Sequence, residues 1–542
     1  MLPQDSFATL VAGGLLPGRK CAGDCVWSRM PLGTELLSRS LALGESLRLS
    51  DSDQRERDRV QQVLCDLNCW YSSGARLTWG IPGSTSSAFQ DWLGSRILWW
   101  PNGIPQGERT AIVSSRLGRR LEEKQDWFEF FRDACANVHQ RGELLISASS
   151  TTTGHFVEQA TSLFSQPGLI FHIGQQKNLA SWWHKLKLPT ANDARPLYLA
   201  FVSPEIVVDN CAGNRQVSDA PARDRVVIAG SDRIIVVQMR RKGNLQRLIR
   251  ARLTDGNRRW RPGSTIYTTN AKLISRQLQE WLTDKNGVAW HTPNRKNSQS
   301  SVVATSSSAK PRHSDVRTPS FLSPTEIRKI CADIPYLTHC TRRQDSDWPG
   351  AARASYIDAL ILGRKEAQHG AIDALTRIIR SKRLAASSLK TRGTTAVVSL
   401  TSVFLDQISK LRHFQTHLAR WDFEPYGISI EREWLMQQGA RPVLYGDDDT
   451  WDQLSPPLQP FFQLRGTRDR NGITNRQWET EREWRHIGDI VLDTLPANKA
   501  FVFVPSASEA QRINRISRWP VAVLSPNYQL PNYQANRLLR RC

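Results

Sequence analysis

The chain lacks a stretch of about 18 consecutive apolar residues, which argues against a membrane-spanning helix. Residues 1–17 are mildly apolar, but they carry Asp5 early and no basic segment before the apolar run, so we expect no signal peptide. The nine cysteines are an odd number in a chain whose apolar content is ample for several cores. Such cysteine usage favours a reducing compartment over a disulfide scaffold, and we expect a cytoplasmic protein.

Acidic residues are scarce relative to basic ones, because 51 Asp and Glu stand against 73 Lys and Arg, giving a formal net charge of +22. This excess predicts a polyanionic partner, and a nucleic acid, DNA in the first place, is the expected one. Much of it lies between residues 240 and 261, where guanidinium groups flank a tryptophan and suit phosphate contacts combined with base stacking. A solvated basic helix face is the alternative. The predicted nucleic-acid-binding residues are Arg240, Arg241, Lys242, Arg250, Arg252, Arg258, Arg259 and Trp260.

Composition divides the chain into four parts. We expect a Trp- and Cys-containing module over residues 1–104, an α/β domain over 105–291, a flexible linker over 292–324 and an α+β domain over 325–542. The linker is the clearest boundary, because its Asn, Ser, Lys, Pro and Thr residues cannot bury enough apolar surface to offset the entropy of ordering. The predicted fold class is therefore multidomain, α/β followed by α+β.

The second part alternates between apolar strands and amphipathic helices. This alternation predicts a parallel sheet, in which ligands bind at the carboxyl ends of the strands. The predicted strands are 110–114, 143–147, 168–172, 197–202 and 234–238, and the predicted helices are 122–139 and 155–164.

Two loops follow these strands at the expected ligand edge. Ser115 and Arg116 lie in the first, and Thr151, Thr152 and Thr153 lie in the second, directly before a helix. Hydroxyl groups and free amides at a helix start can hold a phosphate, so these residues are candidates for nucleotide binding. Ordinary helix capping by Ser and Thr is the alternative.

The order of these elements resembles the Rossmann-like families that include the lysine-decarboxylase-like nucleotide hydrolases and the DNA-processing single-strand-binding proteins. The resemblance rests on Ser115-Arg116-Leu117-Gly118, on Ser150-Thr151-Thr152-Thr153-Gly154 and on Lys242-Gly243-Asn244-Leu245. Those families have a glycine-rich second loop, which hydroxyl residues largely replace in this chain. The resemblance implies a nucleotide or nucleic-acid ligand and no particular reaction.

Residues 478–485 read Trp-Glu-Thr-Glu-Arg-Glu-Trp-Arg and come just before a strand-like run. Their alternation predicts an extended segment with Glu479, Glu481 and Glu483 on one face. Three carboxylates in a row repel one another unless positive charge lies opposite, which arginines, a metal or a substrate that becomes cationic would supply. An edge strand carrying surface ion pairs is the alternative.

The order of elements in the last part resembles the ADP-ribosyltransferase-like fold of DNA-targeting toxins and abortive-infection proteins. The residues that carry the resemblance are His339 on a first strand, Ser399 and Thr401 on a hydroxyl-bearing strand, and the late Glu-rich segment. The resemblance implies that His339 holds the nicotinamide ribose of NAD and that Ser399 and Thr401 support the cleft. It further implies that Glu481 or Glu483 stabilises the positive charge that develops when a glycosidic bond breaks. We place Arg485 among the substrate-binding residues.

Two equally spaced cysteine pairs occur in the opening module, Cys21 with Cys25 and Cys65 with Cys69. At helical spacing each pair presents two thiolates to one side, so the four cysteines could bind one tetrahedral zinc ion. Buried free cysteines are the alternative.

Together these features predict a nucleic-acid-directed enzyme that modifies a base or nucleotide in a prokaryotic DNA-modification or phage-defence system, with ADP-ribosyl transfer as one route. Partner proteins of the same system are expected. The alternatives are a non-catalytic adaptor that senses a nucleotide and binds DNA, and a base-modifying enzyme that works without NAD.

Overall fold

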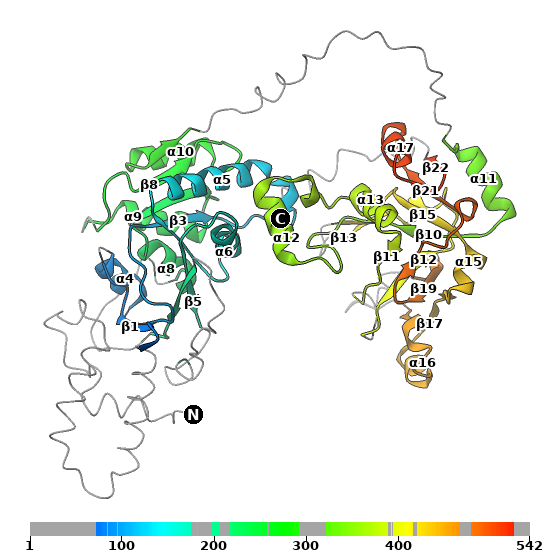
Figure 1. Ribbon diagram of the computed structural model, residues 1–542, viewed down its shortest axis with the longest axis horizontal. Coiled ribbons are helices and arrows are strands. Elements are labelled where there is room, and N and C mark those ends of the chain that lie inside the picture. The colour runs from blue at the N-terminus through cyan, green and yellow to red at the C-terminus, as the bar shows by residue number, and fades with distance from the viewer. Residues whose placement is uncertain are drawn as a thin grey trace, which may run out of the picture. The chain divides into compact units, whose positions relative to one another are not determined.

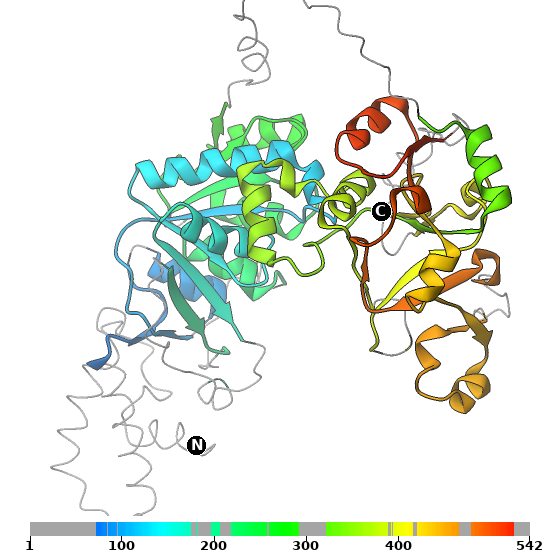
Figure 2. The same cartoon turned by 45° about the vertical axis from the view of Figure 1, so that its right-hand side comes forward.

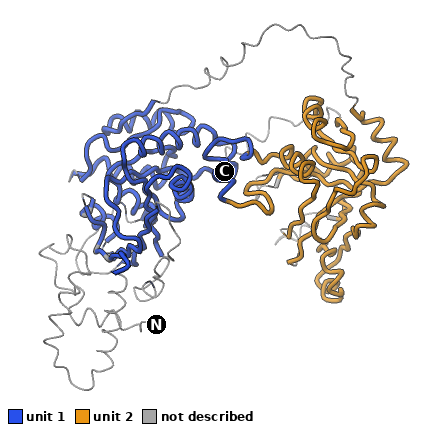
Figure 3. The backbone as a smooth tube through the Cα atoms, in the orientation of Figure 1, with its two compact units in different colours: residues 1–305, 354–367 blue, residues 306–353, 368–542 orange. Residues whose placement is uncertain are grey.

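The computed structural model describes residues 72–83, 85–94, 96–174, 182, 197–205, 217, 219–256, 259–291, 321–388, 392, 394–415, 420–465 and 478–524. The chain divides into two compact units (Figure 3). Unit 1 comprises residues 1–305 and 354–367, and unit 2 comprises residues 306–353 and 368–542. None of the helices within these described ranges is long and apolar enough to cross a membrane.

A nine-stranded sheet forms the centre of the described part of unit 1 (Figure 1). Its strands are β1 (Arg76–Trp79), β2 (Ile97–Trp100), β3 (Arg109–Ser114), β4 (Leu144–Ala148), β5 (Gly168–Ile173), β6 (Leu197–Val202), β7 (Arg233–Gln238), β8 (Thr265–Thr268) and β9 (Val288–Trp290). Their order is β1-β2-β6-β5-β4-β3-β7-β8-β9. The seven strands from β6 to β9 pair in parallel, whereas β1 and β2 add an antiparallel edge. The predicted parallel α/β sheet is thus present, and the antiparallel edge draws on the module that the sequence assigned to residues 1–104.

The strand order reverses between β3 and β7. From β3 the chain adds β4, β5 and β6 successively on one side, and it then returns to place β7 on the other side of β3. In open parallel sheets this reversal leaves a crevice outside the carboxyl ends of the two central strands, where ligands bind. The residues that follow β3 and β7 are therefore the expected ligand-binding residues of this sheet.

Helices cover both faces of this sheet (Figures 1 and 2). Alternate strand residues enter two separate cores, since Ala111 and Val113 of β3 join one buried cluster and Ile112 joins the other. The first core lies against α4, α8, α9 and α10, and the second lies against α5, α6 and α12. The helices are α4 (Ser86–Leu93), α5 (Gln125–Gln140), α6 (Gly154–Leu163), α8 (Ala222–Ala229), α9 (Asn244–Leu253), α10 (Arg276–Asp284) and α12 (Arg353–Leu362).

Helix α12 comes from a distant part of the sequence. Residues 354–367 belong to unit 1, although the residues on both sides of them belong to unit 2. The sequence predicts this segment as part of the carboxy-terminal domain, but it belongs to unit 1 because its apolar side chains complete the core beside α5 and α6.

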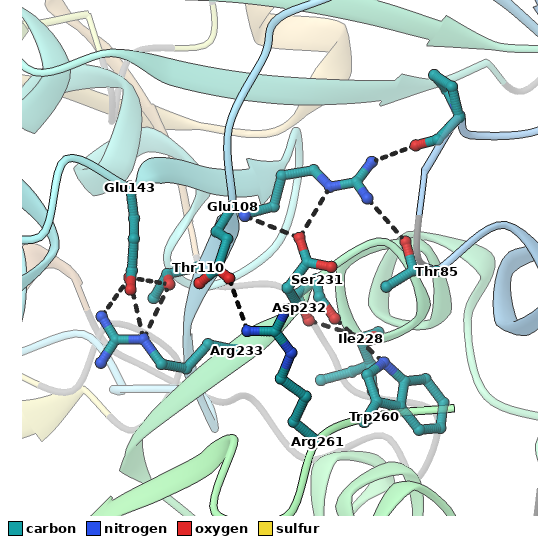
Figure 4. Close-up of polar contacts among 12 residues, drawn as sticks. Thr85, Glu108, Thr110, Glu143, Ile228, Ser231, Asp232, Arg233, Trp260 and Arg261 are labelled. Atoms are coloured by element: carbon teal, nitrogen blue, oxygen red, sulfur yellow. Dashed lines mark hydrogen bonds and ion pairs between the residues drawn. The ribbon is translucent and has the colours of Figure 1, made fainter. Parts of the chain in front are cut away.

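Charged residues are buried at the amino-terminal edge of the same sheet (Figure 4). At the start of β3, the Arg109 backbone amide donates to Asp232 at 2.9 Å. Glu143 accepts hydrogen bonds from Thr110 at 2.5 Å and from the Arg233 Nε at 3.0 Å. These groups tie the strand starts together, so the amino-terminal edge is closed by internal pairing.

Unit 2 is built on a mixed sheet of seven described strands in the order β16-β19-β12-β10-β15-β21-β22. Its pairs are antiparallel except for β21 with β22. The strands are β10 (Tyr336–Cys340), β12 (Val397–Thr401), β15 (Gly427–Glu431), β16 (Arg441–Pro442), β19 (Glu483–Ile487), β21 (Ala500–Val504) and β22 (Val521–Val523). The paired short strands are β11 (Arg383–Leu384) with β20 (Ile490–Val491), β13 (His413–Gln415) with β14 (Arg420–Asp422), and β17 (Leu444–Gly446) with β18 (Phe462–Leu464).

Helices also lie on both faces of the unit 2 sheet. Helices α13, α15 and α17 pack with Leu337 and Leu400 in one core, whereas α11 and α14 pack with Phe501 and Phe503 in another. The helices are α11 (Pro324–Asp333), α13 (Ala371–Ser381), α14 (Ile408–Leu411), α15 (Arg432–Gln437), α16 (Asp448–Gln453) and α17 (Ala507–Asn514). The expected α+β character of this part is present.

The Glu-rich segment is not one extended strand. Residues Trp478–Glu481 form a short 3-10 helix, η7, and the strand β19 begins only at Glu483. Between them Arg482 adopts a left-handed backbone with φ of 44°. The prediction of three carboxylates on one strand face was therefore wrong, because the chain turns before the strand starts.

Candidate nucleic-acid interface

The candidate site lies where β3 and β7 end. The register of β3 against β7 shifts between Val113 and Ser114, at the end of β3, as at a β-bulge or a similar irregularity. The Ser114 hydroxyl accepts a hydrogen bond from the indole of Trp127 at 2.9 Å, which fixes the loop to the start of α5. A β-bulge redirects the chain at a strand end, and bulges are common beside functional sites.

Backbone contacts join the loops that follow these two strands. The amide of Ser115 donates to the carbonyl of Gln238 at 2.8 Å, and the Ser115 hydroxyl accepts from the amide of Arg240 at 3.1 Å. The Arg240 guanidinium returns to the carbonyl of Arg116 at 2.6 Å. Two loops that the sequence separates by more than a hundred residues thus form one surface.

The charged side chains of this surface are exposed. Arg116, Arg240, Arg241 and Lys242 all belong to the exposed class. Arg241 is oriented by a hydrogen bond to Gln277 at 2.9 Å. Lys242 has a left-handed backbone with φ of 59° and donates its amide to the Gln246 side chain at 2.6 Å, which turns the chain into α9. Four cations at one strand-end crevice form a surface that attracts phosphate groups.

The helix starts near this surface differ in charge. In the described helices α6 and α9, the first turn carries no acidic residue and no side chain caps the amides. Helix α5, in contrast, has Asp126 in its first turn and follows Glu122 and Glu123 of the 3-10 turn η3 (Leu121–Glu123). Because the positive end of a helix dipole favours anions, α6 and α9 suit a phosphate and α5 does not.

The hydroxyl loop after β4 is partly occupied by its own contacts. Thr151 donates its hydroxyl to the carbonyl of Ala148 at 2.7 Å, and the hydroxyl of Thr153, which is buried, lies 3.3 Å from that of Ser147. Thr152 is half-buried. The buried hydroxyl of Thr153 stabilises the loop, so the surface available to a ligand is made by the loop amides and the half-buried residues.

Part of the predicted basic cluster is structural instead. Arg252 is 4% exposed and donates to the carbonyls of Ile228, Ser231 and Asp232 at 2.7 to 3.0 Å. Burial lowers the pKa of its guanidinium, but the ordinary value is so high that the group stays charged at neutral pH. Its guanidinium lies 4.6 Å from the centre of the Trp260 ring.

Trp260 and Arg259 also serve the fold. Trp260 is 8% exposed, and its indole donates to the carbonyl of Ser231 at 3.1 Å (Figure 4), so it cannot stack on a base. Arg259 pairs with Asp91 at 2.7 Å and is largely buried. The prediction that Arg252 and Trp260 contact nucleic acid was therefore wrong, because both fill the interior between α9 and β7. Arg250 is exposed in the last turn of α9, and Arg258 lies outside the described residues.

In unit 2, the three strands that carry the predicted catalytic residues are neighbours. β12 pairs with β10 through Thr401 and Thr338, and with β19 through Thr401 and Glu483. Thr338, Thr401 and Glu483 therefore share one face of the sheet, and His339 follows Thr338 and faces the other side. Leu337, on the His339 face, belongs to a different core from Tyr336 and Cys340, which agrees with this alternation.

His339 makes a structural contact on its own face. Its Nδ1 lies 2.9 Å from the carbonyl of Ser399. Burial lowers the pKa of this imidazole, the hydrogen bond with Ser399 opposes that shift, and the charge of Arg342 adds to it. His339 and Glu483 thus lie on opposite faces of the sheet and do not share a site, and the use of NAD stays a prediction.

Glu483 and Arg485 form an internal ion pair. The two side chains are bidentate, with Arg485 Nε to Oε1 at 3.0 Å and Nη2 to Oε2 at 3.1 Å. Arg485 is 2% exposed and also donates to the carbonyls of Pro460 and Phe462. The prediction that Arg485 binds substrate was wrong, because its donors are used within the fold. Glu483 is held as its counter-ion, in a largely buried pair on an inner strand and not in the surface ion pairs of an edge strand that the alternative expected.

Glu481 lies on a backbone that β12 holds in place. Its carbonyl accepts the Thr401 hydroxyl at 2.5 Å, and the next carbonyl, of Arg482, accepts the amide and hydroxyl of Ser402 at 3.1 and 3.2 Å. These contacts stabilise the left-handed conformation of Arg482. Thr401, which is buried, therefore has a positioning contact, whereas Ser399 is exposed and faces Arg485 across the strands.

Comparisons with known proteins do not identify a family for this chain. No family model and no curated protein matches the chain. A solved structure, DNA processing protein A from Streptococcus pneumoniae, matches over 54% of this chain and 95% of that chain, at 13% identity and a TM-score of 0.28. A TM-score this low does not show that the two proteins share a fold, so the candidate site is described from the contacts within this chain alone.

Metal binding finds no support in the described part of the chain, where no group of three His, Cys, Asp or Glu residues converges. Cys21, Cys25, Cys65 and Cys69 lie outside the described residues, so the zinc site stays a prediction.

Several supporting residues of the interface were not anticipated from the sequence. Gln238, Gln246 and Gln277 position the basic loop, and Ser147 and Trp127 fix the neighbouring loops. Glutamine and tryptophan side chains carry no spacing signal of their own. Only the strand order, which brings the two loops together, makes them recognisable.

Proposed function

We propose that unit 1 binds the phosphodiester backbone of a nucleic acid, with DNA as the expected polymer, at the carboxyl ends of β3 and β7. The observation that carries this proposal is the joined surface of Arg116, Arg240, Arg241 and Lys242 beside the open start of α9. Exposed cationic side chains and helix amino termini without a side-chain cap both favour the binding of phosphate groups. The net charge of +22 extends the attraction to a polymer.

A dinucleotide cofactor fits this edge less well than a nucleic-acid strand does. Dinucleotide sites use a glycine-rich first turn and an acidic residue that holds the ribose. The first loop here reads Ser-Ser-Arg-Leu-Gly, and residues 144–154, which span β4 and its loop, contain no acid. A ligand recognised mainly through its phosphates agrees with these features.

The test is the affinity of the full chain for fluorescently labelled single-stranded and duplex DNA. Changing Arg240, Arg241 and Lys242 together to Ala should weaken binding about tenfold or more at moderate salt, since three phosphate contacts are lost. The matched control changes Arg261, which is exposed, and Lys285, which is partly exposed, to Ala. Equal affinities of the wild type and the triple variant would contradict the proposal.

We further propose, as a second candidate function, that unit 2 modifies a nucleotide base of the bound strand without NAD, with Glu481 as the acting carboxylate. Hydrogen bonds to the carbonyls of Glu481 and Arg482 hold the left-handed backbone of Arg482 in place. This supports the proposal, because strained backbone conformations that neighbouring contacts enforce are concentrated at functional sites. A fixed carboxylate stabilises positive charge that develops when a glycosidic bond breaks. A DNA-binding adaptor without this chemistry is the alternative.

Nucleoside mass analysis of DNA incubated with the protein separates these two cases. We expect a mass change or base release that Glu481→Gln abolishes while folding is kept. Glu483→Gln should instead lower the free energy of unfolding by about 3 kcal/mol, because Arg485 would be left buried without its counter-ion. DNA binding without any mass change would support the adaptor.

A further inference from the structure

A segment whose neighbours in the sequence belong to unit 2 packs on α5 and α6 of unit 1. Residues 354–367 complete the core of unit 1, whereas residues 306–353 and 368–542 form unit 2. The chain therefore passes between the units three times, at 305/306, 353/354 and 367/368. We propose that α12 and the turn after it act as a noncovalent latch, which keeps the two halves in one particle independently of the 292–324 segment.

The apolar face of the latch is nearly fully buried. Tyr356, Ile357 and Leu360 are between 3% and 7% exposed, and Ile361 is fully buried. All four belong to the same buried cluster as the aromatic face of α5, which includes Phe131. A helix packed only by accident would not bury four large side chains in the core of unit 1.

Specific polar contacts at the rim fix the register of the latch. The Gln159 amide of α6 donates to Asp358 at 2.7 Å. At the carboxyl end of α12, the Arg132 guanidinium of α5 donates to the carbonyl of Ile361 at 2.7 Å. Gly363 follows with φ of 66°, and a Cβ there would lie 3.2 Å from the Arg132 Nη1. The guanidinium thus caps the helix at a point where the chain turns back.

The apolar residues, Asp358 and the carboxyl end of α12 are therefore all contacted, as expected for a docked helix. The segment that packs on this surface is an apolar helix with a Tyr-Ile-x-x-Leu-Ile pattern, and residues 354–367 supply it. The polar contacts of the latch, made by Gln159 and Arg132, involve none of the residues of the proposed nucleic-acid interface, so the two proposals can be tested separately.

The experiment uses the full chain with a protease site placed between residues 292 and 320. After cleavage, the amino-terminal and carboxy-terminal fragments should elute as one particle of undiminished mass in size-exclusion chromatography with light scattering. Changing Ile357 and Leu360 together to Asp should release them as two species. The matched control changes Ala354 and Ser355, which are exposed on the same segment, to Asp and should leave the particle intact.

A second measurement guards against simple misfolding of the double variant. A synthetic peptide of residues 353–368, added in excess to the cleaved wild type, should displace the carboxy-terminal fragment, and the same peptide with Leu360→Asp should not. Separation of the wild-type fragments, persistent association of the double variant, or failure of the wild-type peptide to displace the fragment would each overturn the proposal.

Discussion

Two arginines of α9 that are close in sequence have opposite roles. Arg250 is exposed, whereas Arg252 is buried and donates to three backbone carbonyls beneath the helix. The two side chains project in different directions because two residues span about 200° of a helix turn. Their effects on stability and on nucleic-acid binding should therefore separate.

Changing Arg252 to Met should lower the free energy of unfolding by about 3 kcal/mol, because buried carbonyl groups lose their donors. Changing Arg250 to Ala should leave the stability within about 0.5 kcal/mol of the wild type. Urea denaturation of the two variants checks this prediction. Similar stabilities would show that Arg252 does not support the fold as its contacts indicate.

Glu143 gives the stability a pH dependence. Burial by itself would raise the pKa of this carboxyl, but hydrogen bonds from Arg141, Thr110 and Arg233 lower it on balance. Because the folded pKa lies below the unfolded one, ionised Glu143 stabilises the fold above the unfolded pKa, and this contribution is lost as the pH falls through the folded value.

Between pH 7 and about pH 3, the free energy of unfolding should therefore fall less steeply in Glu143→Gln than in the wild type. Denaturation at a series of pH values measures the two slopes. Parallel slopes would mean that Glu143 titrates equally in the folded and unfolded states.

At the scale of elements, two glycines at helix starts differ in the space that surrounds them. A Cβ on Gly154, at the start of α6, would lie 2.3 Å from the carbonyl of Ala148, which is backbone and cannot move away. A Cβ on Gly243, before α9, would lie 3.5 Å from the carbonyl of Arg240, an ordinary contact. The turn after β4 thus requires glycine, and the turn before α9 does not.

We expect Gly154→Ala to destabilise the protein by about 2 kcal/mol, through overpacking against the strand end. Gly243→Ala should change stability by less than about 0.5 kcal/mol. Thermal unfolding of both variants decides the matter. If Gly154→Ala were as stable as Gly243→Ala, the tight path of the β4 loop would be contradicted.

The elements that sequence reasoning recovers are those with strong local patterns. Continuous apolar runs such as Thr110–Ser114 and Gly168–His172 predict buried parallel strands, and the structure has β3 and β5 there. Elements defined by distant partners were missed. The docked position of α12 depends on α5 and α6, and the turn at Arg482 depends on Ser402, so neither leaves a periodic signal.

The faces of the unit 2 strands could not be predicted either, because they depend on how distant strands pair. The sequence places His339, Thr401 and Glu483 on separate strands, and those strands are indeed neighbours. Which face each side chain occupies depends on the pairing of Thr338 with Thr401, which local sequence does not specify. A shift of one residue would have joined His339 and Glu483 on one face.

At the scale of the whole molecule, some of the basic residues stabilise the fold and others are exposed on the surface. Arg109 and Arg252 are buried and Arg233 is half-buried within unit 1, whereas Arg116, Arg240, Arg241 and Lys242 are exposed where the strand order reverses. Net charge alone predicts an anionic partner, and burial decides which cations can meet it. The candidate interface is therefore smaller than the basic stretch that the sequence showed.

The most direct test of the central claim is the salt dependence of DNA binding by the wild type and by the Arg240→Ala, Arg241→Ala, Lys242→Ala variant. If these side chains contact phosphates of a single strand, the slope of log K against log salt should become shallower by about 2 in the variant, since each contact contributes roughly 0.7. The control variant with Arg261→Ala and Lys285→Ala should keep the wild-type slope. Identical slopes for all three proteins would contradict nucleic-acid binding at the carboxyl ends of β3 and β7.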